Sequence, residues 1–125
     1  MLTMAGCSKR EDSGQMAQSE ASVDAGLKAF EERRWEVAEQ QLSKAIENGG
    51  LLPDLAEAAM RSLAVSRIHL GQLEEAKADL QQLEQGATEM DHFLLATAEL
   101  ALKQGDTGAA RKAIGEARKW NPSVK

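Results

Sequence analysis

The sequence contains few of the residues on which many folds depend. Aromatic residues make up 3% of the chain, tyrosine is absent, and a single cysteine excludes a disulfide framework. No apolar stretch approaches the roughly 18 residues that a membrane-spanning helix needs. No segment alternates apolar and polar residues as a half-buried strand does. Alanine, leucine, glutamate, glutamine and lysine dominate instead, so the composition predicts one all-α domain.

Motifs for catalysis and metal binding are missing too. His69 and His92 are the only histidines, and neither has a cysteine or a second histidine at metal-ligand spacing. The sequence has no nucleophile elbow, phosphate-binding glycine loop or zinc-protease motif. A net charge of -5 disfavours nucleic-acid binding by counterion release. We therefore expect a protein that is not an enzyme, uses no metal or cofactor and does not bind nucleic acid.

A short sequence motif recurs along the chain. Its copies contain Arg33-Arg34, Gly71-Gln72 and Gly105-Asp106, and the last two are 34 residues apart (71 to 105). A period of this size is typical of stacked helix pairs. After each turn, residues at spacings of four and three share one helix face, where small side chains allow close helix packing. These residues are Ala38, Leu42 and Ala45; Ala76, Leu80 and Leu83; and Ala110, Ile114 and Ala117.

On these residues the chain resembles the tetratricopeptide repeat family, most closely in Lys103-Gln104-Gly105-Asp106 with Ala110, Ala117 and Pro122. The resemblance covers about residues 19–122 and implies an αα-hairpin repeat solenoid of three repeats in a right-handed superhelix, with 123–125 as a tail. Some positions depart from the family pattern. No large aromatic residue opens a first helix, and Arg67 stands where a tyrosine or a small residue is usual.

Glycine, proline and capping residues predict the ends of six helices. Gly49-Gly50, Gly71 and Gly86 end helices, and Pro53 suits the first turn of the third. Thr88 is expected to cap the fifth helix, and Asp106 or Thr107 the sixth. The expected helices are about 19–32, 35–48, 53–70, 73–85, 88–103 and 107–121.

The resemblance also implies a binding surface, because the first helix of each pair lines the concave face in this family. The larger apolar residues of these helices could equally belong to the core, whereas polar residues within an apolar stripe usually face solvent or a ligand. By position the candidate groove residues are Val23, Leu27 and Phe30; Arg61, Val65, Ile68 and His69; and His92, Leu95, Glu99 and Leu102.

The N-terminal segment 1–18 resembles the end of a truncated bacterial lipoprotein signal. Met4-Ala5-Gly6-Cys7-Ser8 matches the lipobox, with Cys7 as the lipidation site, and the polar residues 8–18 suggest a flexible tether. Only six residues precede Cys7, too few for the apolar core of a signal. Either the true start lies upstream and the protein is lipid-anchored in the cell envelope, facing the periplasm, or the protein is cytoplasmic.

The sequence as a whole predicts a non-enzymatic module that presents a concave helical groove to a peptide or helix of a partner protein, with membrane contact only through a lipid at Cys7. A cytosolic adaptor of the same kind is one alternative. A second is a subunit that self-associates as a homodimer or assembles into a complex through its last helix, whose exposed apolar face would contain Ala110, Ala113, Ile114, Ala117 and Trp120.

Overall fold

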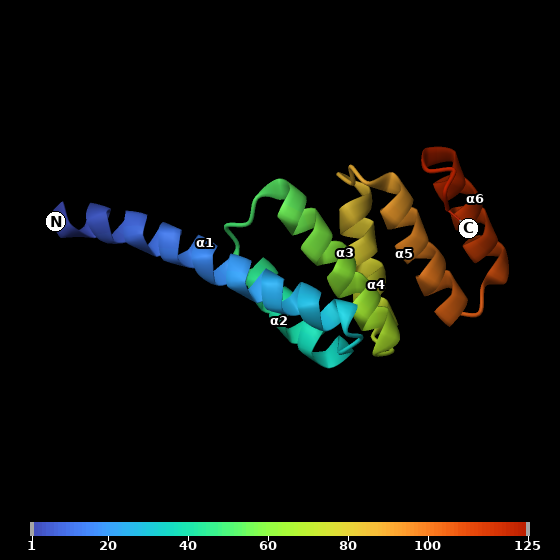
Figure 1. The fold of residues 1–125 in the computed structure, drawn as a ribbon, viewed down its shortest axis with the longest axis horizontal. Helices are drawn as coiled ribbons and strands as arrows, with labels where there is room; N and C mark the ends of the chain where they lie inside the picture. Colours follow the sequence, from blue (N-terminus) through green and yellow to red (C-terminus); the bar gives the residue numbers. More distant parts are fainter. Residues whose placement is uncertain (1, 125) are drawn as a thin grey trace.

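The computed structural model describes the backbone of residues 2–124 and the side chains of residues 14–124. Throughout this part of the chain the regular secondary structure is helical, which confirms the all-α prediction. The helices are α1 (Leu2–Glu31), α2 (Trp35–Asn48), α3 (Pro53–His69), α4 (Leu73–Glu84), α5 (Met90–Lys103) and α6 (Thr107–Trp120) (Figure 1).

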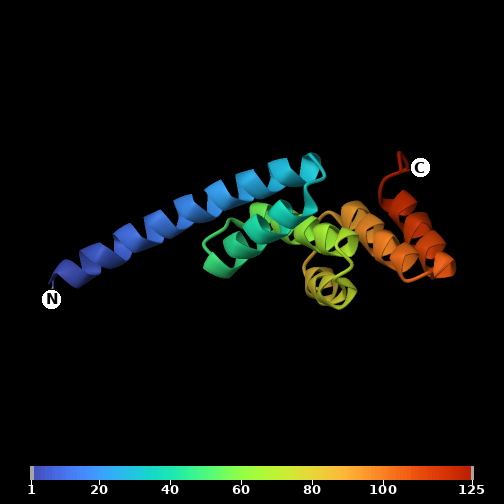
Figure 2. The same cartoon turned by 90° about the horizontal axis from the view of Figure 1, so that it is seen from below.

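The helices pack as consecutive pairs. α1 lies against α2, α3 against α4, and α5 against α6, and the pairs follow one another along the long axis of the molecule (Figures 1 and 2). Neighbouring pairs meet where α2 contacts α3 and α4 contacts α5, and the first helices α1, α3 and α5 also contact one another in sequence. We call the pairs the first, second and third hairpins.

The turns inside the three hairpins have the same geometry. In each, one residue has a positive φ: 61° at Arg33, 81° at Gly71 and 79° at Gly105. The N–H of that residue donates to the carbonyl three residues earlier, at 3.0 to 3.1 Å, and the next N–H donates to the carbonyl five residues before it, at 2.8 Å. These are the two bonds of a Schellman C-cap, which glycine favours because it lacks a Cβ. Arg33 adopts the same conformation with a Cβ, at a steric cost.

The second helices contact their neighbours through the small residues that the sequence singled out. Ala38, Ala76 and Ala110 are all buried, as the spacing predicted. A tight contact lies in the first hairpin, where a Cβ added to Gly26 would come within 2.6 Å of Leu42 Cγ. The helices therefore pack closely against one another at these small residues.

The first helix is longer than the sequence predicted. α1 begins at Leu2, so the polar segment 8–18, expected to be a flexible tether, is helical. Side-chain bonds secure part of this extension to the end of α2. Ser19 Oγ donates to the Gly49 carbonyl (2.6 Å), Asn48 Nδ2 donates to Ser19 Oγ (2.8 Å), and the Gln15 amide donates to the Asn48 carbonyl. With these anchors and no proline to interrupt it, the helix continues beyond the predicted start.

The start of α5 differs from the prediction as well. Thr88 does not cap this helix. Instead Glu57, from α3, accepts hydrogen bonds from the backbone N–H groups of Thr88 and Glu89 and from the Thr88 hydroxyl, at 2.8 to 3.1 Å. The Glu89 N–H is the main cause of a lowered pKa at Glu57, since the bond stabilises the ionised carboxylate. A carboxylate from another hairpin thus occupies the N-terminus of α5. The other predicted cap is confirmed: Asp106 accepts from the Ala109 N–H at the start of α6.

The apolar face of α6 is covered rather than exposed. Ala110, Ala113 and Ala117 are buried and Ile114 is partly buried, mainly because α6 packs on α5. The expectation that these residues would be left uncovered is therefore wrong. Trp120 alone of that set is largely exposed, at 65%.

Candidate functional site

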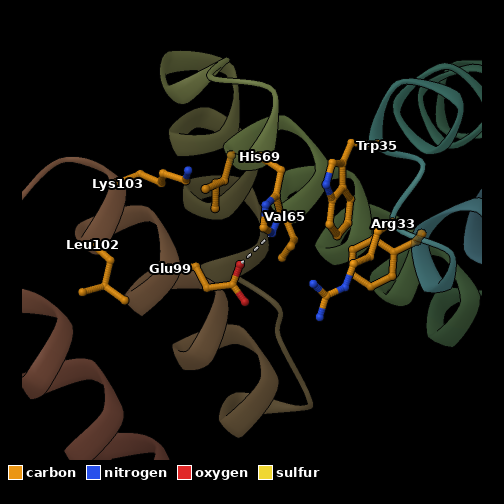
Figure 3. A pocket seen from close by; sticks show the side chains of 9 residues that line it. Arg33, Trp35, Val65, His69, Glu99, Leu102 and Lys103 are labelled. Carbon is orange, nitrogen blue, oxygen red and sulfur yellow. Dashed lines mark ion pairs between the residues drawn. The ribbon is translucent and has the colours of Figure 1, made fainter.

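Two adjoining hollows cross the first helices of the three hairpins. The larger has a volume of about 590 Å³, the smaller about 290 Å³, and both include Phe30 from α1, Val65 from α3 and Glu99 from α5. We call the larger the aromatic pocket, the smaller the second hollow, and the two together the groove. The aromatic pocket is lined by Phe30, Arg33, Trp35, Val65, Ile68, His69, Glu99, Leu102 and Lys103 (Figure 3). The second hollow is lined by Phe30, Arg61, Ser62, Val65, His92, Leu95, Ala96 and Glu99.

Three rings in contact form one side of the aromatic pocket. The Trp35 indole and the His69 imidazole lie parallel, with centroids 4.0 Å apart and planes at 1°. Phe30 meets Trp35 edge to face, at 5.5 Å and 74°. Such pairs add to the stabilisation that burial alone gives. Because the rings come from α1, α2 and α3, the stack fixes the first hairpin against the second.

His69 also faces the third hairpin. Its Nε2 lies 3.7 Å from Glu99 Oε2, and a dashed line marks this pair in Figure 3. The distance suits an ion pair when the imidazole is protonated and is too long for a hydrogen bond. His69 therefore touches the first hairpin through Trp35 and faces the third through Glu99.

The two walls of the aromatic pocket carry cations. Arg33 and Lys103 lie on opposite sides of His69 and Glu99 (Figure 3). Both are exposed, and among residues 14–124 neither makes an ion pair. They come from the turn of the first hairpin and from the end of α5.

In the second hollow a guanidinium nitrogen lacks a hydrogen bond. Arg61 Nη1 is buried and lies 3.7 Å from Glu89 Oε1, beyond hydrogen-bonding distance, and no other described acceptor reaches it. His92 Nε2 also faces Glu89, at 3.4 Å. Asp91, beside it, accepts a bond from Asn121 Nδ2 (3.1 Å), which lowers the pKa of the Asp91 carboxyl.

Nine of the eleven predicted groove residues line the two hollows. Val65 and Ile68 form the floor, and Ile68 is only 1% exposed. The two exceptions are on α1. Val23 is fully buried in the core of the first hairpin, and Leu27 packs against the same core. Val23 is thus unable to contact a partner in this structure, because α2 and α3 cover the face of α1 on which it lies.

Sequence reasoning missed three residues of the aromatic pocket. Arg33 lies in a turn, Trp35 at the start of a second helix and Lys103 at the end of a first helix, whereas the family resemblance directed attention to the middle of the first helices. One signal was available for Trp35. It is one of only two tryptophans in a chain with 3% aromatic residues, and tryptophan is enriched at binding sites.

Arg67 belongs to a separate cluster of charges. Its guanidinium lies 2.7 Å from Asp79 on α4 and 3.5 Å from Glu39 on α2, and all three side chains are mostly buried. Burial raises the pKa of Asp79 even though the Arg67 hydrogen bond opposes the rise. Removal of water therefore outweighs the attraction of the guanidinium, so this ion pair gives little net stability.

Two further observations concern metals and membranes. Among the described residues there is no group of three histidine, cysteine, aspartate or glutamate side chains placed to hold a metal ion. Within the same part of the chain no helix combines the length and the apolarity needed to cross a bilayer. The side chain of Cys7, the predicted lipidation site, lies outside the described residues. Comparisons with protein-family models, with curated proteins and with solved structures found no match.

Proposed function

We propose that the three hairpins are tetratricopeptide-like repeats, stacked as a solenoid with a right-handed superhelical twist. The shared Schellman geometry of the turns at Arg33, Gly71 and Gly105 supports this proposal. So does the burial of alanine at the same repeat position in all three second helices. Contacts between neighbouring hairpins only are also expected of a solenoid.

On this basis we propose that the protein is a non-enzymatic module that binds a peptide or helix of a partner protein in the groove. One observation carries the proposal: residues from α1, α3 and α5 line two adjoining hollows with an apolar floor and exposed polar and apolar walls. Leu102, on the wall of the aromatic pocket, is 55% exposed and therefore open to contact with a partner. Helix packing forms the groove before a partner binds. Most of the conformational entropy lost on binding is therefore lost by the partner.

The test is a selection from a library of random peptides displayed on phage. We expect the wild-type protein to enrich peptides whose affinity falls about tenfold or more in Leu102→Glu, because the substitution places a charge on the apolar wall. Leu52→Glu is the matched control, since Leu52 is 60% exposed in the α2–α3 loop and outside the groove. Circular dichroism should show the same helicity for both variants. Equal loss in both variants, or no peptide that depends on Leu102, would contradict the groove.

We propose two further properties. Cys7 carries a lipid that tethers the domain to the envelope if a signal precedes Met1, and the protein is otherwise a cytoplasmic adaptor. Mass spectrometry of the protein from bacterial membranes, with Cys7→Ser as control, distinguishes the two. Self-association through α6 rests on the exposed indole of Trp120, and sedimentation of wild type and Trp120→Glu tests it. A monomer at all concentrations would exclude that route.

A further inference from the structure

The chemistry of the groove indicates what kind of segment fills it; this inference rests on the proposed function above. The aromatic pocket, about 590 Å³ in volume, has an apolar floor of Val65 and Ile68 and a wall formed by the edge-to-face pair of Phe30 and Trp35. These dimensions and this lining suit a large apolar side chain, aliphatic or aromatic.

The charge around the pocket differs from that of the whole chain. The protein has a net charge of -5, yet Arg33 and Lys103 are the residues that flank the aromatic pocket, and neither has an ionic partner within residues 14–124. The one carboxylate in the pocket, Glu99, already faces His69. Two unpaired cations beside an apolar cavity attract carboxylates and disfavour basic partners.

The second hollow has a different charge balance. Arg61 Nη1 is buried and makes no hydrogen bond, and it lies 3.7 Å from Glu89 Oε1. His92 Nε2 lies 3.4 Å from the other oxygen of the same carboxylate. The cations of the groove that lack an ionic partner within residues 14–124 are therefore Arg33 and Lys103, at the aromatic pocket.

We infer that the groove receives an acidic segment of a partner protein, which inserts one bulky apolar side chain into the aromatic pocket and places side-chain carboxylates against Arg33 and Lys103. The carboxylates belong to internal aspartate or glutamate residues. A free peptide C-terminus is not required, because the two cations lie on opposite sides of the aromatic pocket rather than at one point.

The same phage selection tests the composition of the partner, provided that the library is fused through the peptide C-terminus so that no free carboxylate is present. We expect the peptides that depend on Leu102 to contain a large apolar residue flanked by aspartate or glutamate. Enrichment of neutral or basic peptides that depend on Leu102 would overturn the acidic assignment and leave the proposed function intact. If no peptide depends on Leu102, both fail.

Charge variants supply the second measurement, made on an enriched peptide synthesised as the C-terminal amide. Arg33→Gly combined with Lys103→Gln should weaken binding about tenfold at low salt and flatten its salt dependence. Arg33→Lys, which keeps the charge, should bind like wild type, and so should Arg111→Gln, which removes an exposed cation of α6. Glu99→Gln should bind about twofold or more tightly, since it removes a repulsive charge. Unchanged affinity in the double variant, or binding only by the free-acid form of the peptide, would overturn the inference.

Discussion

The two junctions between neighbouring hairpins join the same kind of helices with different chemistry. At the first junction Arg67 reaches Glu39 across α2 and α3, and Trp35 stacks on His69, so mostly buried charge and ring contact hold it. At the second junction Glu57 accepts backbone N–H groups at the start of α5, near the surface. Similar helix packing therefore does not require similar side-chain contacts. At the first junction, loss of one member of the charge cluster should lower the free energy of unfolding strongly. The contribution of the second junction to that free energy should depend on pH.

The largest effect is expected from Arg67→Met at the first junction. The substitution leaves Asp79 and Glu39 mostly buried without their cation and should lower the free energy of unfolding by about 2–4 kcal/mol. The double variant Arg67→Met/Asp79→Leu should recover most of this loss, because it removes the stranded charge as well. Urea unfolding of wild type, single and double variants measures both values.

The pH dependence of Arg67→Met sharpens the same test. A carboxyl whose pKa is raised by folding, as at Asp79, contributes most stability below its ordinary value and loses it as the pH rises through the raised value. The deficit of Arg67→Met should therefore shrink as the pH falls from 7 towards about 4. A deficit that is constant over this range would mean that lost packing, and not the charge, causes it.

A second substitution probes the tight contact within the first hairpin. In Gly26→Ala the new Cβ would lie 2.6 Å from Leu42 Cγ and 3.2 Å from Leu42 N, and Leu42 is fully buried. We expect a loss of about 1–3 kcal/mol in thermal or urea unfolding. Gly115→Ala in α6, where nothing lies within 4 Å of the added atom, should instead stabilise by about 0.5–1 kcal/mol. The same sign for both variants would contradict the packing argument.

The turn of the first hairpin offers a smaller, stabilising change. Arg33 has φ 61° where the other hairpins have glycine, so Arg33→Gly should relieve strain and raise stability by about 0.5–1 kcal/mol after the added freedom of the unfolded chain is counted. The converse variant Gly105→Ala should destabilise by about 1 kcal/mol. Differential scanning calorimetry of the pair checks whether the shared turn geometry has this energetic consequence.

The smallest effect belongs to the second junction. Glu57→Gln should cost about 0.5–1 kcal/mol, a low value because the carboxylate is near the surface. Since folding lowers the pKa of Glu57, its contribution is present above the ordinary glutamate value and is lost as the pH falls through the lowered one. The free energies of unfolding of wild type and Glu57→Gln should therefore converge at acidic pH. Glu31→Gln, at an exposed position of α1, is the control and should show no such convergence.

Local spacing made much of the fold predictable. The positions of Ala38, Ala76 and Ala110 follow from helical periodicity, and Gly71 and Gly105 end helices because they accept positive φ. Contacts between distant segments were not predictable in this way. The Glu57 cap joins residues about 30 positions apart, and the bonds from Ser19 and Gln15 to the end of α2 extend α1 without a local signal.

The candidate site was predicted less completely than the fold. Helical spacing and the resemblance identified the stripe from Phe30 to Leu102, but they did not tell which apolar residues a neighbouring helix would cover, as happened to Val23. Trp35 and Lys103 line the site because one hairpin packs on the next. That placement depends on three-dimensional packing, which a pattern within one helix does not contain.

The Trp35–His69 stack also makes the groove visible to spectroscopy. An indole on the wall of an open pocket emits light at a wavelength that reflects the water around it, so a bound side chain that displaces this water shifts the emission to the blue. The only other tryptophan, Trp120, lies exposed at the far end of α6. In a Trp120→Phe background the protein would therefore report occupancy of its own groove without an attached dye.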